Sequence, residues 1–321
     1  MGIFFLCTSF VLSILLGSTR LSLAEIGAAL RDGVQTSAGA RIFVYVRLPR
    51  TLAALVSGAA LAVSGAVIQY VLANRLASPG IIGVNAGAGL AVTLCTALGV
   101  MGGFRLSLFA FLGAFVTVMV VSFGAKRWGA SRGTVILIGV AMNCLLGAVS
   151  DTITTFIPEV GVMSNDFKIG EFSGVTYPKL IPALFLIVAA ILVLQTLHNE
   201  LDVLTLGEEQ ATALGLPTSL MRTVFLLLAA LLAGCAVSLA GLLSFVGLLI
   251  PHAVKRIAGS KTSMLISLCA LYGAGFVCLC DTLARTVFSP YEIPVGIIMA
   301  YLGAPFFVFI LIKGKGGHQH D

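Results

Sequence analysis

The stretch 223–251, TVFLLLAALLAGCAVSLAGLLSFVGLLIP, decides the fold class, because it runs without a single charged residue. As one helix it would be about 44 Å long at 1.5 Å per residue, whereas the hydrocarbon core of a bilayer is about 30 Å thick. The small residues Gly234, Ser238 and Gly241 fall in its middle, and Pro251 closes it. We therefore predict one full membrane span followed by a second, short one.

The rest of the chain has the same character. Of the 321 residues, 59% are hydrophobic and 10% are charged, against about 25% charged in a soluble domain. Stretches without Asp, Glu, Lys or Arg lie at 1–19, 51–74, 76–104, 106–125, 133–150, 180–199, 223–254, 262–280 and 293–312. With 223–254 divided in two, the sequence predicts an all-α polytopic membrane protein with about ten transmembrane helices. No linker or charge block divides the chain, so we expect a single domain over residues 1–321.

The basic residues indicate membrane anchoring rather than nucleic-acid binding. The net charge is +6, but Lys and Arg stand singly between apolar runs, which is typical of membrane edges. If the N-terminus is inside, the inner segments hold slightly more Lys and Arg than the outer ones, and two outer segments, 20–46 and 151–179, are long. The positive-inside rule counts short loops, so we predict that both termini are cytoplasmic.

The sequence Arg47-Leu-Pro-Arg50 places two arginines three residues apart, on one helical face. Pro49 fits the first turn of a helix, where its missing N–H costs nothing. Arginine at a helix N-terminus opposes the helix dipole, so helix stability alone does not explain the pair. Two interpretations stay open: anchoring to lipid headgroups, or a pair of guanidinium forks for carboxylates on a partner.

Two further segments interrupt the apolar pattern. The stretch 57–69 is dense in small residues, which let helices approach closely, and the polar break 74–79, NRLASP, follows it between two spans. Such a break indicates a re-entrant or gate-like turn that lines a cavity. In the segment 205–217, Thr205 and Glu208 fit a capping box, and Gly215 and Pro217 stop the helix. This short cytoplasmic helix is either a connector or a knob for a partner's groove.

Charged and metal-binding groups elsewhere are few. Asp281 and Arg285 form an i, i+4 pair near an outer helix end. His252 has no Cys, Asp or Glu nearby and is therefore structural or interfacial rather than a ligand. The 7 cysteines lie mostly inside apolar runs without a CxxC pattern, so we expect small hydrophobes and no metal site.

Several motifs are missing from the sequence. It contains no GxxxxGK[ST] loop and no HExxH, which argues against ATP hydrolysis by this chain and against an intramembrane metalloenzyme. Charges are almost absent from the span centres, whereas ion-coupled carriers usually need ionisable groups there. A secondary transporter that works alone is kept as the alternative from a different class.

Taken together, these segments resemble the FecCD-type permeases, the subunits that import iron–siderophores, heme and cobalamin. The resemblance spans most of the chain in the family's order. The matching runs are RLPR at 47–50, SGAALAVSGAVIQ at 57–69, NRLASPGIIGVNAGAG at 74–89, LGEEQATALGL at 206–216, FVGLLIPHAVKR at 245–256, EIPVG at 292–296 and LGAPFF at 302–307.

The resemblance implies the architecture of a type II ABC importer permease in the cell membrane, working by alternating access. Its partners would be a second permease subunit, identical or not, two ATPase subunits that hold ATP and Mg, and an extracytoplasmic substrate-binding protein. It implies no cofactor in this chain. The commonest cargo of the family is an iron–siderophore complex, with cobalamin or heme as the alternatives.

The resemblance also implies roles for individual residues, none of them catalytic or metal-binding. Spans 133–150 and 294–312 would line the pathway. The binding protein would dock on Arg47, Arg50 and Arg285, and the cytoplasmic gate would be formed by Asn74 and Leu76. The helix over about 206–216 would couple to the ATPase through Leu206, Gly207, Glu208, Glu209, Ala213, Leu214 and Gly215.

The sequence departs from the family pattern at two places. Where the family has Asn-Pro-Leu-Ala at the gate turn, this chain has Arg75 in the proline position. Where the family has Trp and Ser in an outer W-x-x-G-S pattern, the matching residues are Phe167 and Glu171. We expect these departures to bear on gate rigidity and on docking at the outer face.

Overall fold

The computed structural model describes residues 2–17, 19, 26–27, 29, 31, 37–100, 102–127, 132–259 and 261–315, with side chains to residue 308. Over these residues every regular element is a helix. The helices are α1 (Gly2–Leu15), α3 (Ala38–Ile42), the π-helical turn η1 (Phe43–Arg47), α4 (Leu48–Val71), α5 (Val84–Ala97), α6 (Gly103–Arg127), α7 (Arg132–Phe156), α8 (Pro158–Ile169), α9 (Tyr177–Thr196), α10 (His198–Thr205), α11 (Glu208–Ala213), α12 (Thr218–Ala240), α13 (Val246–Ala258), α14 (Thr262–Thr286) and α15 (Val295–Lys315).

The apolar stretches predicted to span a membrane are helices. Six helical stretches are long and apolar enough to cross a bilayer: Ala38–Val71, Gly103–Arg127, Arg132–Phe156, Tyr177–Thr196, Thr218–Ala240 and Thr262–Thr286. Three shorter apolar helices are Gly2–Leu15, Val84–Ala97 and Val295–Val308. Together with α13, these helices occupy, in order, the ten predicted stretches of the described chain. The all-helical, multi-span fold is therefore confirmed.

The division of the deciding stretch is also confirmed, because α12 ends at Ala240 and α13 begins at Val246. Gly241 has a φ of +71°, and a Cβ there would collide with the carbonyl oxygen of Phe167. The last turn of α8 and the loop after it close onto the break: the N–H of Leu242 donates to Phe167 O at 2.9 Å, and the N–H of Glu171 donates to Ala240 O at 2.8 Å. Backbone groups exposed by the break are thus satisfied within the protein, as a membrane interior requires.

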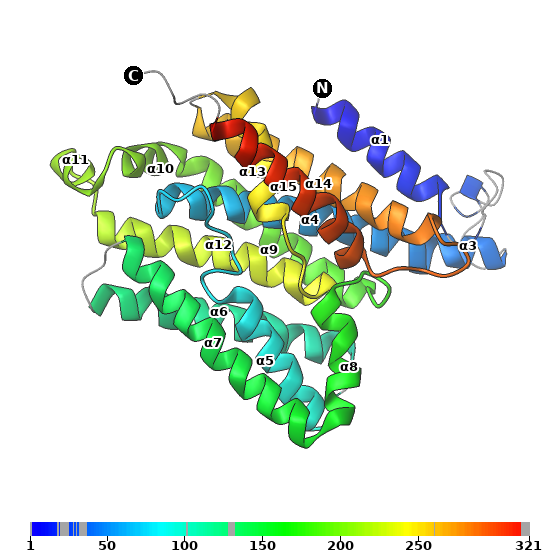
Figure 1. Ribbon diagram of the computed structural model, residues 1–321. Helices are drawn as coiled ribbons and strands as arrows, with labels where there is room; N and C mark the ends of the chain where they lie inside the picture. The colour runs from blue at the N-terminus through cyan, green and yellow to red at the C-terminus, as the bar shows by residue number, and fades with distance from the viewer. Residues whose placement is uncertain are drawn as a thin grey trace.

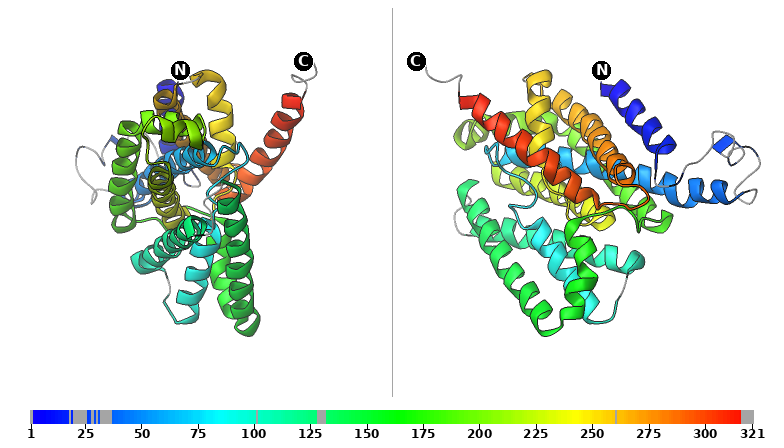
Figure 2. Two further views of the ribbon diagram at one scale, coloured as in Figure 1. Left: turned by 90° about the vertical axis from the view of Figure 1, so that its left-hand side faces the viewer. Right: turned by 45° about the vertical axis from the view of Figure 1, so that its right-hand side comes forward.

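Helix α4 is the centre of the bundle and packs most extensively against α14 and α12 (Figure 1). The predicted close approach of its small residues is present: a Cβ at Gly58 would collide with Gly273 O on α14, and one at Gly65 with Gly247 O on α13. Helices α5 to α8 form a second group that joins the first chiefly where α6 packs against α12. Figure 2 shows that α15 stands out from the bundle at its C-terminal end.

Helix α4 begins at Leu48 with Pro49 in its first turn, as predicted, but RLPR does not begin the helical run. The helical backbone begins at Ala38, where the side chain of Ser37 caps it, and η1 carries it on to α4. Pro49 follows this π-helical turn directly. Proline lacks an N–H, and a local π turn is one way for a helix to accommodate such a missing bond. Arg47 and Arg50 therefore lie inside a continuous helical run.

Candidate functional site

Charged groups that are far apart in the sequence meet at one end of the bundle, which we call the arginine end. Arg50 on α4 donates to Asp281 on α14 through Nε at 3.1 Å and Nη2 at 3.0 Å, and to Glu292 through Nη1 at 2.7 Å. The Nε of Arg285 lies 3.0 Å from Asp281 Oδ2, which confirms the predicted i, i+4 pair. Asp281 has no exposed surface, so one fully buried carboxylate is shared by two guanidinium groups.

Helix α1 is tied to the same cluster by its last turn. Arg285 Nη2 donates to Ser13 Oγ at 2.8 Å. The Arg47 guanidinium donates to the carbonyl oxygens of Ile14 at 2.8 Å and Thr19 at 2.5 Å. Carbonyl groups at a helix C-terminus lack intrahelical partners, and a cation there also suits the helix dipole. Arg47 therefore acts as the cap of α1.

Docking of a binding protein on Arg47, Arg50 and Arg285 stays a prediction. The three side chains are only 3%, 7% and 3% exposed, and each is bonded within the chain. A carboxylate from outside would have to compete with Asp281 or Glu292. Glu292, whose side chain is 32% exposed, is the accessible carboxylate of the two.

At the other end of α4, the predicted polar break is an irregular segment, 72–83, which we call the connector. It begins with Ala73 at a φ of +46°. Asn74 Oδ1 accepts a hydrogen bond from the N–H of Leu76 at 2.9 Å, which shapes the turn around Arg75. Arg75 and Leu76 are both exposed. The break is confirmed, and the gate role of Asn74 and Leu76 stays a prediction.

Asn143 on α7, which lies outside the motifs described above, holds the connector. Its Nδ2 donates to Gly80 O at 2.8 Å and to Ile81 O at 3.3 Å. One turn earlier, Gly139 packs so closely that a Cβ there would collide with Ile81 O. An isolated amide inside an apolar helix is a signal for an interhelical hydrogen bond, and this signal would have found Asn143.

Replacing Asn143 with Ala should loosen the connector, because Ile81 O loses its side-chain donor and Gly80 O keeps only the N–H of Gly83. An unsatisfied buried polar group costs about 1–3 kcal/mol, which corresponds to roughly tenfold faster local amide exchange. We expect this acceleration over residues 77–83 in hydrogen-exchange mass spectrometry of the protein in nanodiscs. Thr152→Ala on the same helix is the control, since Thr152 bonds only within α7. Exchange at the wild-type rate in Asn143→Ala would show that the amide does not restrain the connector.

The predicted coupling helix is α11, but the predicted capping box is wrong. Gly207 is the N-cap with no side-chain bond, and the Thr205 hydroxyl donates to Asp202 O inside α10 instead. The predicted end at Gly215 is confirmed: its φ is +84°, and its N–H donates to Thr212 O at 2.9 Å.

Helix α11 is anchored by one ion pair. The Nη2 of Arg222, on α12, lies 2.9 Å from Glu208 Oε2, with side-chain exposures of 7% and 51%. Beside it, Arg132 at the start of α7 donates to Leu204 O on α10 at 2.9 Å. Ala211 faces inward with no exposed surface, whereas Leu214 is 67% exposed. The arrangement presents an exposed apolar side chain on a helix that is fixed to a long span.

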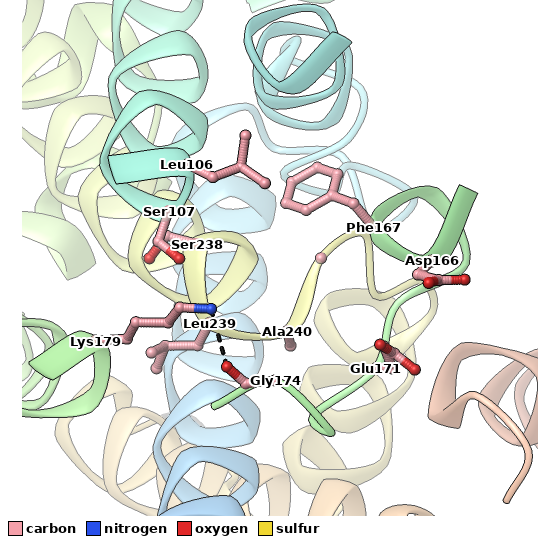
Figure 3. Close-up of a pocket in the computed structure, with 11 residues that line it drawn as sticks. Leu106, Ser107, Asp166, Phe167, Glu171, Gly174, Lys179, Ser238, Leu239 and Ala240 are labelled. Atoms are coloured by element: carbon pink, nitrogen blue, oxygen red, sulfur yellow. Dashed lines mark hydrogen bonds between the residues drawn. The ribbon is translucent and has the colours of Figure 1, made fainter. Parts of the chain in front are cut away.

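A small cavity opens where the loop after α8 meets the end of α12 (Figure 3). Its volume is about 120 Å³, below the roughly 300–1,000 Å³ of pockets that enclose drug-sized ligands. Asp166 and Glu171 lie on one side of it, and on the other Lys179 Nζ donates to Gly174 O at 2.9 Å. Phe167 and Glu171, the two positions that depart from the outer-face pattern, both line it. The cavity is too small to hold a metal chelate.

These features define a class: a multi-span membrane permease. A solved structure described as an inward-facing conformation of a metal-chelate type ABC transporter superimposes with a TM-score of 0.85 at 29% identity, covering 97% of both chains. PsaBC from Streptococcus pneumoniae, at 18% identity and a TM-score of 0.56 over 88% of this chain and 95% of that one, shares the fold alone.

The chain belongs to the FecCD transport family, whose model matches residues 5–313. It is 35% identical to the uncharacterized ABC transporter permease protein YvrB of Bacillus subtilis, over 98% of this chain and 93% of that protein. It is 37% identical to the vitamin B12 import system permease protein BtuC of Yersinia enterocolitica, over 86% and 83%. The protein is therefore a permease subunit of an ABC importer, multi-pass and not itself catalytic. Its family works without a cofactor in this subunit, and the ATPase is a separate chain.

Proposed function

We propose that this permease passes an iron–siderophore complex across the cell membrane by alternating access. The observation that carries the proposal is the anchoring of α11. The sequence contains no nucleotide-binding loop. The short helix α11 is nevertheless held on α12 by the Arg222–Glu208 pair, in an exposed position where a separate ATPase subunit can contact it. The relative named for vitamin B12 import makes cobalamin an alternative cargo, and heme is kept as the other alternative that the family resemblance implies.

In this proposal the two ends of the bundle have different partners. The arginine end is extracytoplasmic and receives the substrate-binding protein at Arg47, Arg50 and Arg285. The end with the connector and α11 is cytoplasmic, as are both termini. The gate is formed by Asn74 and Leu76. The coupling surface to the ATPase consists of Leu206, Gly207, Glu208, Glu209, Ala213, Leu214 and Gly215, and the whole chain is one permease domain.

The described surface supports a second permease subunit as partner. Within its most apolar part α7 is only 17% buried, against 78% for the stretch that contains α4. On α15, Tyr301 is 74% exposed and Val308 is 53% exposed. The helices expected to line the pathway, α7 and α15, are thus left largely uncovered by their own chain. We propose that a second subunit, identical or not, faces them and completes a passage wide enough for the cargo.

Transport in reconstituted vesicles tests the function. The permease, its ATPase and its binding protein should take up a radiolabelled ferric siderophore only when ATP is hydrolysed. An ATPase subunit unable to hydrolyse ATP should abolish uptake, and an uncoupler should leave it unchanged. Labelled cobalamin and heme are tested in parallel to decide the cargo. Uptake that persists without hydrolysis, or that stops with the uncoupler while ATP stays high, would support an ion-coupled carrier instead.

A further inference from the structure

Four basic groups gather at the α11 end, around the connector; we call Arg75, His252, Lys255 and Arg256 the cationic cluster. Arg75 is exposed in the connector, between the two proposed gate residues. The other three lie on the last two turns of α13, which is not among the candidate spans. Lys255 and Arg256 are exposed and His252 is half-buried. The Nζ of Lys255 lies 4.8 Å from the centroid of the Tyr70 ring, at the end of α4. The charges of the cluster thus come from two segments, the connector and α13.

The two segments are held in a fixed relation. Helices α4 and α13 cross at Gly65 and Gly247, where a Cβ on Gly65 would collide with Gly247 O. One turn further along α4, Gln69 Nε2 donates to Gly247 O at 3.0 Å. Arg75 follows the end of α4 by a few residues, so the cations of α13 stay close to it.

The cluster behaves as one electrostatic unit. Burial, and after it the positive charges of Arg256, Arg75 and Lys255, lower the pKa of His252. Burial and Arg75 likewise lower the pKa of Lys255. Both shifts disfavour a further positive charge at this place, as expected where like charges converge.

The charges of this cluster lack internal partners of the kind that Arg222 and Arg132 have at the same end. Arg222 is paired with Glu208, and Arg132 donates to a carbonyl group. Among the described residues, Arg75, Lys255 and Arg256 form no ion pair with a carboxylate. Asp202, the acidic side chain of α10 near Tyr70, accepts a hydrogen bond from Thr262 instead. An uncompensated group of cations attracts anions and raises their local concentration.

We propose that the cationic cluster is an exit site for the cargo, and that the cargo is a metal chelate with a net negative charge. This inference rests on the proposed function, in which cargo passes the gate. Lipid headgroups or acidic residues of the ATPase would account for the cations of α13, but they give no role to a charge in the gate turn itself. A departing anion meets Arg75 beside Leu76 and then the cations of α13.

Binding to the permease–ATPase complex in phosphatidylcholine nanodiscs, without the binding protein, tests the inference. The probes are a ferric tricatecholate with a charge of −3 and a neutral ferric trihydroxamate. We expect the anionic chelate to bind about tenfold tighter and to weaken with salt. The triple variant Arg75→Gln, Lys255→Gln, Arg256→Gln should lose this preference and leave the neutral probe unchanged. Arg127→Gln, which removes an exposed cation from the same end on α6, should change neither.

Several outcomes would overturn the inference. Equal binding of the two chelates, no binding of the anionic one at about 1 mM, or an unchanged preference in the triple variant would each do so. In a parallel assay with nanodiscs that also contain phosphatidylglycerol, loss of binding to this lipid alone in the variant would assign the cluster to lipid. Loss of the ATPase from the complex would assign the cluster to the ATPase interface. Retention of a monodisperse complex shows that the variant is folded. Vesicle uptake is scored separately: no ATP-driven uptake of any chelate counts against the proposed function, whereas the binding assay reports on the cluster.

Discussion

Asp281→Asn should strongly destabilise the arginine end of the bundle. Asp281 has no exposed surface and bonds both Arg50 and Arg285. The amide has nearly the same shape but no charge, so two buried guanidinium groups lose their shared carboxylate. Removing one partner of a buried ion pair costs about 3–5 kcal/mol, which corresponds to a fall of roughly 10 °C in apparent melting temperature. Fluorescence-detected size exclusion after heating, in detergent or nanodiscs, measures this fall.

Two variants make the Asp281 result specific. Asp166→Asn changes an exposed carboxylate with no ion pair among the described residues and should leave the melting temperature unchanged. Asp281→Asn combined with Arg285→Met removes a cation along with the anion, so part of the loss should be recovered. A single variant as stable as wild type would mean that the guanidinium groups are satisfied without Asp281, and the buried cluster would then not hold α1, α4 and α14 together.

Because Arg47 and Arg50 are buried, reversing their charges is not a clean test of docking. Arg47→Glu and Arg50→Glu would place negative charges against the carbonyl groups of α1 and against Asp281. Such a double variant would report loss of the bundle rather than loss of a surface contact. Glu292 is more accessible and accepts a hydrogen bond from the Nη1 of Arg50, so changes there disturb the buried cluster less than changes of Arg47 or Arg50.

The helices could be predicted because hydropathy is a local property. Each apolar stretch is long enough to be recognised as a membrane helix from its own residues. The small residues around Gly241 likewise predicted the break before α13. The residues at which helices begin were harder to predict. The start at Ala38 depends on the Ser37 cap, a single side-chain bond, and Thr205 bonds inside α10 although its spacing to Glu208 fits a capping box.

The sequence predicted which residues belong to the site, but not which residues they bond. The resemblance pointed to Arg50 and Glu208, yet nothing local says that Arg50 bonds Asp281, 231 residues away, or that Glu208 bonds Arg222. Such pairs follow from the way that α4 packs on α14 and α11 on α12. Asn143 was missed for the same reason, because its acceptors are backbone carbonyl groups whose position depends on the fold.

Glu208→Gln should uncouple ATP hydrolysis from transport. The Arg222–Glu208 pair fixes α11 to α12, so in the proposed function it transmits motion of the ATPase to a membrane span. We expect uptake per ATP hydrolysed to fall about tenfold while the ATPase stays bound and active. The Glu208 side chain is 51% exposed, whereas that of Arg222 is 7% exposed, so the melting temperature is measured beside the ratio to show that unfolding does not cause the loss. The measurement is the ratio of labelled cargo taken up to phosphate released in the same vesicles.

A carboxylate outside the proposed coupling surface supplies the control. Glu159, in the first turn of α8, is exposed and forms no ion pair among the described residues, so Glu159→Gln should keep the wild-type ratio. Arg222→Gln should lower the ratio as Glu208→Gln does, and the double variant should be no worse than the single ones, because both remove the same link. Additive losses would mean that the two residues act separately. A lowered melting temperature with an unchanged ratio would show that the pair only stabilises α11, and the path of motion from the ATPase would then have to run through the Arg132 contact between α7 and α10.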